Sequence, residues 1–406
     1  MPGHLNFHKK DGMLVTKIQL MTHDHFEQRM ELIQYAFQQQ IPADRIEKER
    51  EVYQPGAEWG IVDEDGRLLS MLAINPLKAW IQGSAFAMGG IGCVASWPDA
   101  RRQGGVSKLM LYALEKMKAD GQTVSMLAPF SFPFYRKYGY ELTIERKAYT
   151  LQKEHLPPRV DVPGRVKLVP KQTELFSEMY EQYASRYNGT LIRDESWWNR
   201  SVWNRPGHAA IYYSESGEAQ GYLIYQIAGR TMTVHEWVEL TDTARLALWS
   251  FVGNHDSMID KLTMTAPMND SLHLHLPDPR FKQEIQPFFM SRIVDAAGFF
   301  ASYPMNPHTR EESLQLKLND SQAPWNDGTF RLDIAEGGAA RLERMDNKAD
   351  GLPSIECEIG ALTALLVGNW NMDVLVNSGK LRGESEAIEL MKRRIPNRTS
   401  YLMDGF

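Results

Sequence analysis

The chain has 406 residues, 43% of them hydrophobic and 24% charged, so it is long enough for two or three domains with separate cores. Its formal net charge of -6 gives no general basic field, which argues against nucleic acid as the main partner. Two cysteines are too few for a disulfide framework or a zinc site, and no apolar run reaches the roughly 18–20 residues of a membrane span.

The first segment opens with a predicted strand and helix. Residues 14–20 alternate apolar and polar side chains as a strand does, and residues 23–38 place apolar side chains along one helical stripe. A hairpin is predicted next, because Glu64, Asp65 and Gly66 separate two apolar runs. We therefore expect a strand, a helix and antiparallel strands before residue 88.

Residues 88–127 read as a strand, a turn, a helix and a second strand. The extended run 88–95 is followed by a helix that should stop at Gly121, and residues 124–127 resume extended structure. The helix is predicted from apolar residues that recur at helical spacing: Val106, Leu109, Met110, Ala113, Leu114 and Met117.

The turn ahead of this helix is basic and rich in glycine. Its residues are Arg101, Arg102, Gln103, Gly104 and Gly105. Backbone N–H groups, the helix dipole and two arginines would surround one point, which predicts an anion site suited to a diphosphate. Neither the Rossmann nor the P-loop glycine pattern is present. The alternative is an ordinary strand-to-helix turn with solvated arginines.

Residues 153–288 repeat the element order of the first segment. After a proline-containing linker, a strand at 166–169 and a helix at 171–187 lead to a hairpin, a strand at 233–239 and a helix from Asp242. The Arg/Gly turn is missing between Glu239 and this helix. Because the anion cradle is absent, we expect no cofactor in the second copy.

The composition changes again from about residue 289. Residues 292–294, 314–318 and 329–333 alternate like strands, and residues 359–367 and 385–391 have amphipathic helical patterns. A third, α+β domain is therefore predicted, ending in a short apolar tail that closes on Phe406.

The turn from Arg101 to Val106 resembles the acetyl-CoA loop of the GNAT acyltransferases, usually [QR]-x-x-G-x-[GA], with Val106 departing from the small last residue. Together with the runs 134–140 and 325–330 and the terminal Phe406, it makes nearly the whole chain resemble the Eis (enhanced intracellular survival) family of aminoglycoside N-acetyltransferases. The resemblance implies two tandem GNAT-like mixed-sheet domains, the second without the cofactor loop, at residues 1–152 and 153–288. A sterol-carrier-protein-like α+β domain would follow at residues 289–406.

The family resemblance also implies the site. The matching residues are Tyr135, which would protonate the departing coenzyme, and Phe406, whose terminal carboxylate would be the general base. Acetyl-CoA, as a cosubstrate without a metal, would be bound by Gly92, Cys93, Val94, Arg101, Arg102, Gln103, Gly104, Gly105, Val106, Ser107, Phe130 and Ser131. A small polycationic amine would be bound by Asp24, Glu27, Phe37 and Asp404. The family's assemblies imply a homo-hexamer, and the lack of a signal peptide implies a cytoplasmic enzyme.

Each assignment has a structural alternative. Tyr135 could be one packed ring in an aromatic region, Phe406 could be a frayed terminus, and the acidic residues could be ordinary helix-surface charges. Two other functions remain open at this point. One is acetyl transfer to protein lysines or polyamines, and the other is a non-catalytic assembly or lipid-carrier role.

Overall fold

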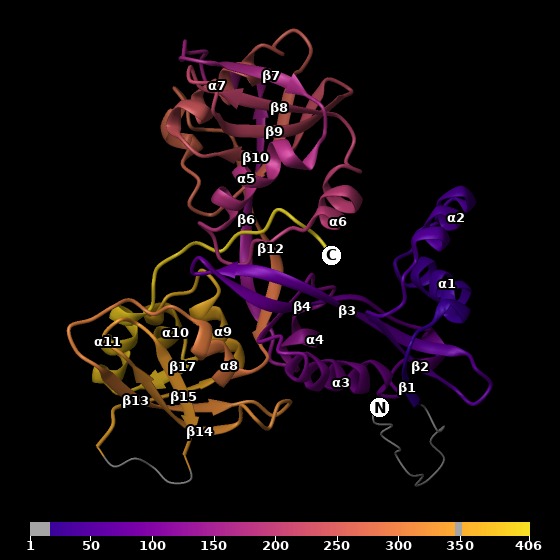
Figure 1. Cartoon of the computed structure of the whole chain (residues 1–406), viewed down its shortest axis with the longest axis vertical. Helices are drawn as coiled ribbons and strands as arrows, with labels where there is room; N and C mark the ends of the chain where they lie inside the picture. Colours follow the sequence, from indigo (N-terminus) through magenta and orange to yellow (C-terminus); the bar gives the residue numbers. More distant parts are fainter. Residues whose placement is uncertain (1–16, 346–350) are drawn as a thin grey trace.

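The structure is a computed structural model that describes residues 17–345 and 351–406. The predicted strand at 14–20 therefore lies partly outside the described residues, and the polar stretch 1–12 lies wholly outside them. Within the described ranges, the strands form one sheet of 12 strands and one of 5 strands (Figure 1).

The large sheet has the order β1-β2-β3-β4-β5-β12-β6-β11-β10-β9-β8-β7. Its bounds in the first half are β1 Lys17–Leu20, β2 Glu58–Val62, β3 Leu68–Ile81, β4 Ser84–Ser96, β5 Val124–Leu127 and β6 Glu141–Gln152. Those in the second half are β7 Arg165–Val169, β8 His208–Tyr213, β9 Ala219–Ala228, β10 Thr231–Glu239, β11 Lys261–Ala266 and β12 Lys282–Ile293. The predicted hairpins and the two-fold repeat of element order are confirmed.

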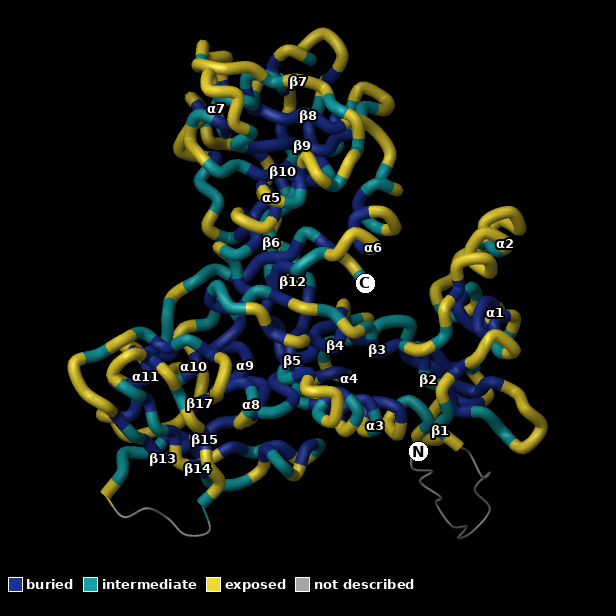
Figure 2. Tube along the Cα trace, viewed as in Figure 1, coloured by how far each residue is buried: buried dark blue, intermediate teal, exposed yellow. Residues whose placement is uncertain are grey.

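Four helices accompany the first half: α1 Phe26–Ala36, α2 Ala43–Val52, α3 Gly105–Ala119 and α4 Phe132–Arg136. The predicted stripe of α3 is buried from Leu109 to Met117, while Val106 is half-buried. Helix α3 ends before Gly121, whose φ of +73° is the left-handed conformation expected there. Helix α2 was not predicted, because it buries none of its residues and so has no apolar stripe (Figure 2).

The two halves of the sheet exchange strands. Residues 290–293 of β12 pair with β5, whereas residues 147–152 of β6 pair with β11. The two strands also pair with each other, and they run through the centre of the molecule in Figure 1. Strand β12 continues in this sheet to Ile293, beyond residue 289, where the third domain is predicted to start.

The second half carries α5 Thr173–Ala184, the short helical turns α6 Glu195–Trp197 and η4 Trp198–Val202, and α7 Asp242–Gly253. The third domain has a sheet of order β15-β14-β13-β16-β17. Its strands are β13 Glu312–Asn319, β14 Gly328–Ile334, β15 Ala340–Arg344, β16 Ser354–Glu358 and β17 Leu381–Gly383. Its helices are α8 Ala296–Ser302, α9 Ile359–Leu366, α10 Met372–Asn377 and α11 Ser385–Arg394.

The largest core cluster joins all three segments. Phe86 of β4, Tyr180 of α5 and Leu362 of α9 belong to the same set of buried apolar residues. Buried residues accordingly occupy β5, the end of β12 and the start of β6 beside it, and α9 in Figure 2. Among the described residues, no helix combines the length and apolar character needed to cross a membrane. The segments are thus packed against one another around shared strands.

Candidate active site

Strands β4 and β5 separate part of the way along their length. They pair in parallel from Met88 with Val124 to Ile91 with Leu127, and the pairing stops there. Just beyond, Cys93 has a φ of +50° and the register between β3 and β4 shifts, as in a β-bulge. The edge of β4 that faces the opening therefore offers free backbone groups at residues 92–94 to an added extended chain.

The side chain of Cys93 takes no part in this opening. It packs beside Leu32, Ile33 and Met71, and burial raises the pKa of its thiol. A protonated, packed thiol leaves the backbone of Cys93 as the group available to a ligand.

The predicted anion loop has the backbone shape that the prediction requires. Arg102 and Gly104 have φ values of +63° and +80°, and α3 begins at Gly105 without a side-chain cap. The amides of the first turn have no carbonyl one turn earlier, so they are free to bind an anion. The side chain of Gln103 fixes the loop, since its Nε2 donates to the Asp99 carbonyl at 2.7 Å.

Two further contacts hold the loop, one with β3 and one with the turn after α4. A Cβ atom at Gly105 would lie 3.0 Å from Ser70 Oγ, so a side chain there would push the helix away from β3. Ser107 Oγ accepts a hydrogen bond of 2.8 Å from the Tyr138 hydroxyl, which ties α3 to the turn after α4. Arg101 and Arg102 remain exposed beside this cradle.

The corresponding helix of the second half has a different start. At α7 the Thr241 hydroxyl accepts a hydrogen bond from the Ala244 N–H at 3.1 Å. One of the amides that an anion would use is therefore already satisfied by the chain itself. This geometry agrees with the expected lack of a cofactor loop in the second half.

Tyr135 lies on α4 with only 2% of its surface exposed. Its ring contacts those of Phe130, Phe134 and Tyr140 at centroid distances of 5.2, 5.1 and 6.1 Å. Burial raises the pKa of Tyr135 well above its usual value. No hydrogen-bond partner of its hydroxyl is found among the described residues, and its role as a proton donor stays a prediction.

The C-terminal tail is anchored along its length. Ser400 N donates to Asn369 Oδ1 at 2.7 Å, Ser400 Oγ donates to the Thr143 carbonyl at 2.5 Å, and Tyr401 N donates to the Asn188 carbonyl at 2.9 Å. The tail thereby contacts all three segments of the chain. These bonds fix its direction and distinguish it from a frayed terminus.

Asp404 is the strongest anchor of the tail. It is 1% exposed, and its two oxygens accept hydrogen bonds from Arg193 Nε at 3.1 and 3.2 Å. Trp197 Nε1 and the Tyr180 hydroxyl donate to the same carboxylate at 2.8 and 3.3 Å. Burial opposes the charge on Arg193, but the carboxylates of Asp404 and Glu236 raise its pKa well above the usual value.

Phe406 ends the tail at the opening between β4 and β5. Its carboxyl carbon is 3.7 Å from the position of a Cβ atom on Gly92. Its ring packs against Phe289 and Trp197 at centroid distances of 5.0 and 6.3 Å, and a Cβ atom on Gly90 would lie 2.8 Å from the ring. The sequence therefore needs glycine at position 90 to seat this ring. The terminal carboxylate lies beside the bulge of β4.

The predicted substrate residues are not all gathered at this point. Asp24, Glu27 and Phe37 lie on or beside α1, where Glu27 is ion-paired with Arg50 of α2. Asp404 is instead enclosed by the anchors described above, so its visible role is to hold the tail. As substrate contacts all four remain predictions.

Sequence reasoning missed two residues that shape the site. Asn75 donates to the Gly90 carbonyl at 3.2 Å, and its Nδ2 lies 3.4 Å from a Cβ position on Gly92. Arg193 positions the tail from a loop of the second segment. Neither side chain belongs to a local motif. Only the glycines at 89, 90 and 92 in a strand indicated that another segment of the chain approaches closely.

Comparisons with known proteins agree with this description. Models of the acetyltransferase (GNAT) domain match residues 17–143 and 189–293, and a model of the sterol carrier protein domain matches residues 296–403. An uncharacterized N-acetyltransferase of Streptomyces avermitilis is 25% identical over 361 residues, which cover 80% of this chain and 82% of that protein.

Solved structures extend the likeness to the whole chain. A probable N-acyltransferase from Enterococcus faecalis is 31% identical with a TM-score of 0.89, and the match covers 97% of this chain and 100% of that one. Eis1 from Mycobacterium abscessus shares the fold, with 19% identity, a TM-score of 0.78 and coverage of 97% and 100%.

The split between β4 and β5, with an anion loop opening α3, defines a coenzyme A-dependent acyltransferase of the GNAT fold. The chain belongs to the GNAT acetyltransferases, and it is an N-acetyltransferase with two tandem GNAT domains and a sterol-carrier-protein-like C-terminal domain. GNAT domains take acetyl-CoA as the cosubstrate. The first domain has the loop geometry for it.

Proposed function

We propose that this enzyme transfers acetyl groups from acetyl-CoA to the amines of aminoglycosides or similar polycationic molecules. The observation that carries the proposal is the terminal carboxylate of Phe406, held beside the bulge of β4 by a tail that is anchored at every turn. The Eis-family resemblance supports the substrate class, and an acidic chain with a free carboxylate at the opening is suited to a cation.

The carboxylate of Phe406 would act as the general base. An amine of pKa about 10.4 is only ~0.1% neutral at pH 7.4, which costs about 4 kcal/mol before attack. A carboxylate beside the reacting centre attracts the ammonium and removes its proton, directly or through one water. The neutral nitrogen then attacks the thioester carbonyl carbon, whose oxygen is polarised by backbone N–H groups at residues 92–94.

Tyr135 would act as the general acid. As the tetrahedral adduct collapses, its nitrogen loses its second proton to solvent and the C–S bond breaks. The coenzyme sulfur takes up negative charge, and the tyrosine hydroxyl supplies the proton that completes the free thiol. The phenolate regains a proton from solvent before the next turnover. With ordinary pKa values of about 10 and 8.5 this transfer is uphill by roughly 2 kcal/mol, and burial of the phenol widens the gap. We therefore expect the hydroxyl to stabilise the sulfur by a hydrogen bond first and to lose its proton late.

A thiol-release assay with acetyl-CoA and three amine classes tests the substrate assignment. Kanamycin-like aminoglycosides should give saturable thiol release at a kcat/KM at least tenfold above that for a lysine peptide or for spermidine. Mass spectrometry of the product should show one added acetyl group per acetylated amine. Release with the lysine peptide or the polyamine alone would replace the aminoglycoside assignment with that acceptor. The homo-hexamer and the cytoplasmic location stay predictions.

A further inference from the structure

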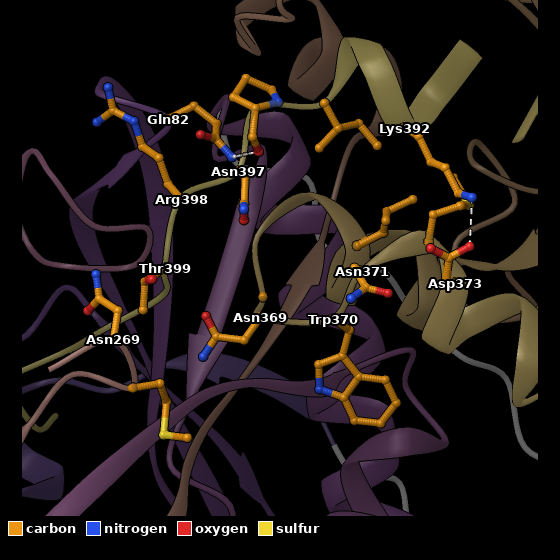
Figure 3. Close-up of a pocket in the computed structure, with 16 residues that line it drawn as sticks. Gln82, Asn269, Asn369, Trp370, Asn371, Asp373, Lys392, Asn397, Arg398 and Thr399 are labelled. Atoms are coloured by element: carbon orange, nitrogen blue, oxygen red, sulfur yellow. Dashed lines mark hydrogen bonds and ion pairs between the residues drawn. The ribbon is translucent and has the colours of Figure 1, made fainter. Parts of the chain in front are cut away.

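A cavity of about 470 Å³ lies where the three segments meet, and among its lining residues Asn369 also anchors the C-terminal tail. Gln82 comes from the turn between β3 and β4, Asn269 from the loop after β11, and Asn369 and Trp370 from the third domain. Residues 395–399, which lead into the C-terminal tail, close another side (Figure 3). Its volume falls in the range of small-molecule sites, which often form between domains.

Two amide groups at this cavity each form hydrogen bonds through only one of their two polar atoms. Gln82 is 7% exposed, and its Nε2 donates to the Tyr303 hydroxyl and to the Pro396 carbonyl at 3.1 Å each. Asn369 Oδ1 accepts from Ser400 N at 2.7 Å. These bonds fix both amide orientations and leave Gln82 Oε1 and Asn369 Nδ2 buried, with no hydrogen-bond partner among the described residues. Two residues that line the cavity thus hold one buried acceptor and one buried donor that lack a partner among the described residues.

Among the described residues that line the cavity, the two cations are paired or point away from the amide groups. Lys392 is paired with Asp373 at 2.6 Å, at one side of the view in Figure 3. The guanidinium of Arg398 donates to the Ser185 carbonyl and points away from the amide groups. A net charge placed between the two amide groups would therefore face no charge of opposite sign among the described lining residues.

The remaining lining fits hydroxyl groups. Asn269, Asn397 and Thr399 supply more groups that can both donate and accept, as a hydroxyl does, and Trp370 adds a flat apolar surface. We propose that this cavity binds a small, neutral, polyhydroxylated molecule such as a monosaccharide, a disaccharide or a cyclitol. Gln82 Oε1 accepts one hydroxyl hydrogen, and Asn369 Nδ2 donates to a second hydroxyl oxygen.

Titration of the full chain with glucose, trehalose and myo-inositol tests the proposal, with saturation-transfer NMR as the readout and no acetyl-CoA present. At least one of them should bind saturably at a millimolar dissociation constant or below. Hydrogen exchange should slow in peptides that cover residues 366–373 and 395–401, because a ligand on Asn369 also steadies the Ser400 amide. Glucosamine and glucuronate should bind at least tenfold more weakly than glucose.

Variants locate the site. Gln82→Met and Trp370→Leu should each weaken binding at least tenfold, and the second keeps the test valid if the first unfolds. Gln283→Met, the same change at an exposed position of β12, should leave binding within twofold. The proposal is overturned if none of the three molecules binds saturably, if both variants bind normally, or if a charged analogue binds best. These measurements do not involve acetyl transfer. Their outcome is therefore independent of whether the proposed catalytic function is right.

Discussion

Replacement of Gly90 by alanine should displace the terminal carboxylate while leaving the cofactor loop intact. The new methyl group would lie 2.8 Å from the ring of Phe406, whereas carbon atoms pack at about 3.5–4.0 Å. The ring must then move by about 1 Å, as must Leu77, whose Cδ1 would lie 2.9 Å from the methyl group, and Phe289 and Trp197 restrict the movement of the ring. A misplacement of ~1 Å at a reacting group costs up to roughly 100-fold in rate.

We therefore expect kcat to fall by roughly 10- to 100-fold in Gly90→Ala, with the Kd for acetyl-CoA unchanged within twofold. Thiol release at saturating amine measures the first quantity, and calorimetric titration with acetyl-CoA measures the second. Overpacking should also lower stability by about 1–3 kcal/mol, which chemical denaturation records. Gly337→Ala is the matched control, because a methyl group there meets no atom within 4 Å.

A second change tests whether the ring causes the loss. Phe406→Leu keeps the terminal carboxylate and shortens the side chain, so the double variant Gly90→Ala, Phe406→Leu should recover at least tenfold of the lost kcat. Full activity of Gly90→Ala, or no recovery in the double variant, would refute the idea that Phe406 positions the base.

Four further outcomes are expected. Extension of the chain by two residues after Phe406 should abolish most turnover without weakening acetyl-CoA binding, and normal kcat in the extended protein would remove the carboxylate from the mechanism. Tyr135→Phe should slow turnover by roughly 10²–10⁴, and a loss of less than a few-fold would reduce Tyr135 to a packing role. Arg193→Met removes the cation paired with the buried Asp404 and leaves Glu236 paired with Arg205 alone, so it should cost about 3–5 kcal/mol in urea denaturation, whereas Arg230→Met, at an exposed ion pair, should change stability little. Burial raises the pKa of Glu239 from an ordinary 4.5 to about 7, so the unfolded chain loses this proton first and the folded state is destabilised as pH rises between those values. The stability of Glu239→Gln relative to wild type should therefore rise by about 2–3 kcal/mol from pH 5 to pH 8, and a margin independent of pH would contradict this assignment.

Most of the fold could be predicted from local sequence patterns. The stripe of α3, its stop at Gly121 and the strand at 124–127 follow from side-chain spacing and turn chemistry, and the structure has all three. The exchange of β6 and β12 has no such signal. Residues 282–287 are polar except for Ile285 and end in Pro287, which argues against a central strand, and only pairing with distant residues makes them extended.

The site divides in the same way. The loop at Arg101–Gly105 could be predicted, because glycines and arginines before a helix have a local chemical meaning. The role of Asp404 could not, because Arg193 is 211 residues away and their pairing exists only after folding. A carboxylate two residues from a proposed catalytic terminus looked like a substrate contact, and burial gives it an anchoring role.

The exchange of β6 and β12 has a consequence for synthesis. A chain that has emerged only as far as residue 152 lacks the strand that belongs between β5 and β6, so its catalytic sheet would be left with two open edges. The first domain can close only when residues 290–293 arrive from the far end of the second. The amino-terminal half is thus expected to need the second half of the sheet in order to fold. Its isolated expression should yield aggregates instead of a smaller enzyme.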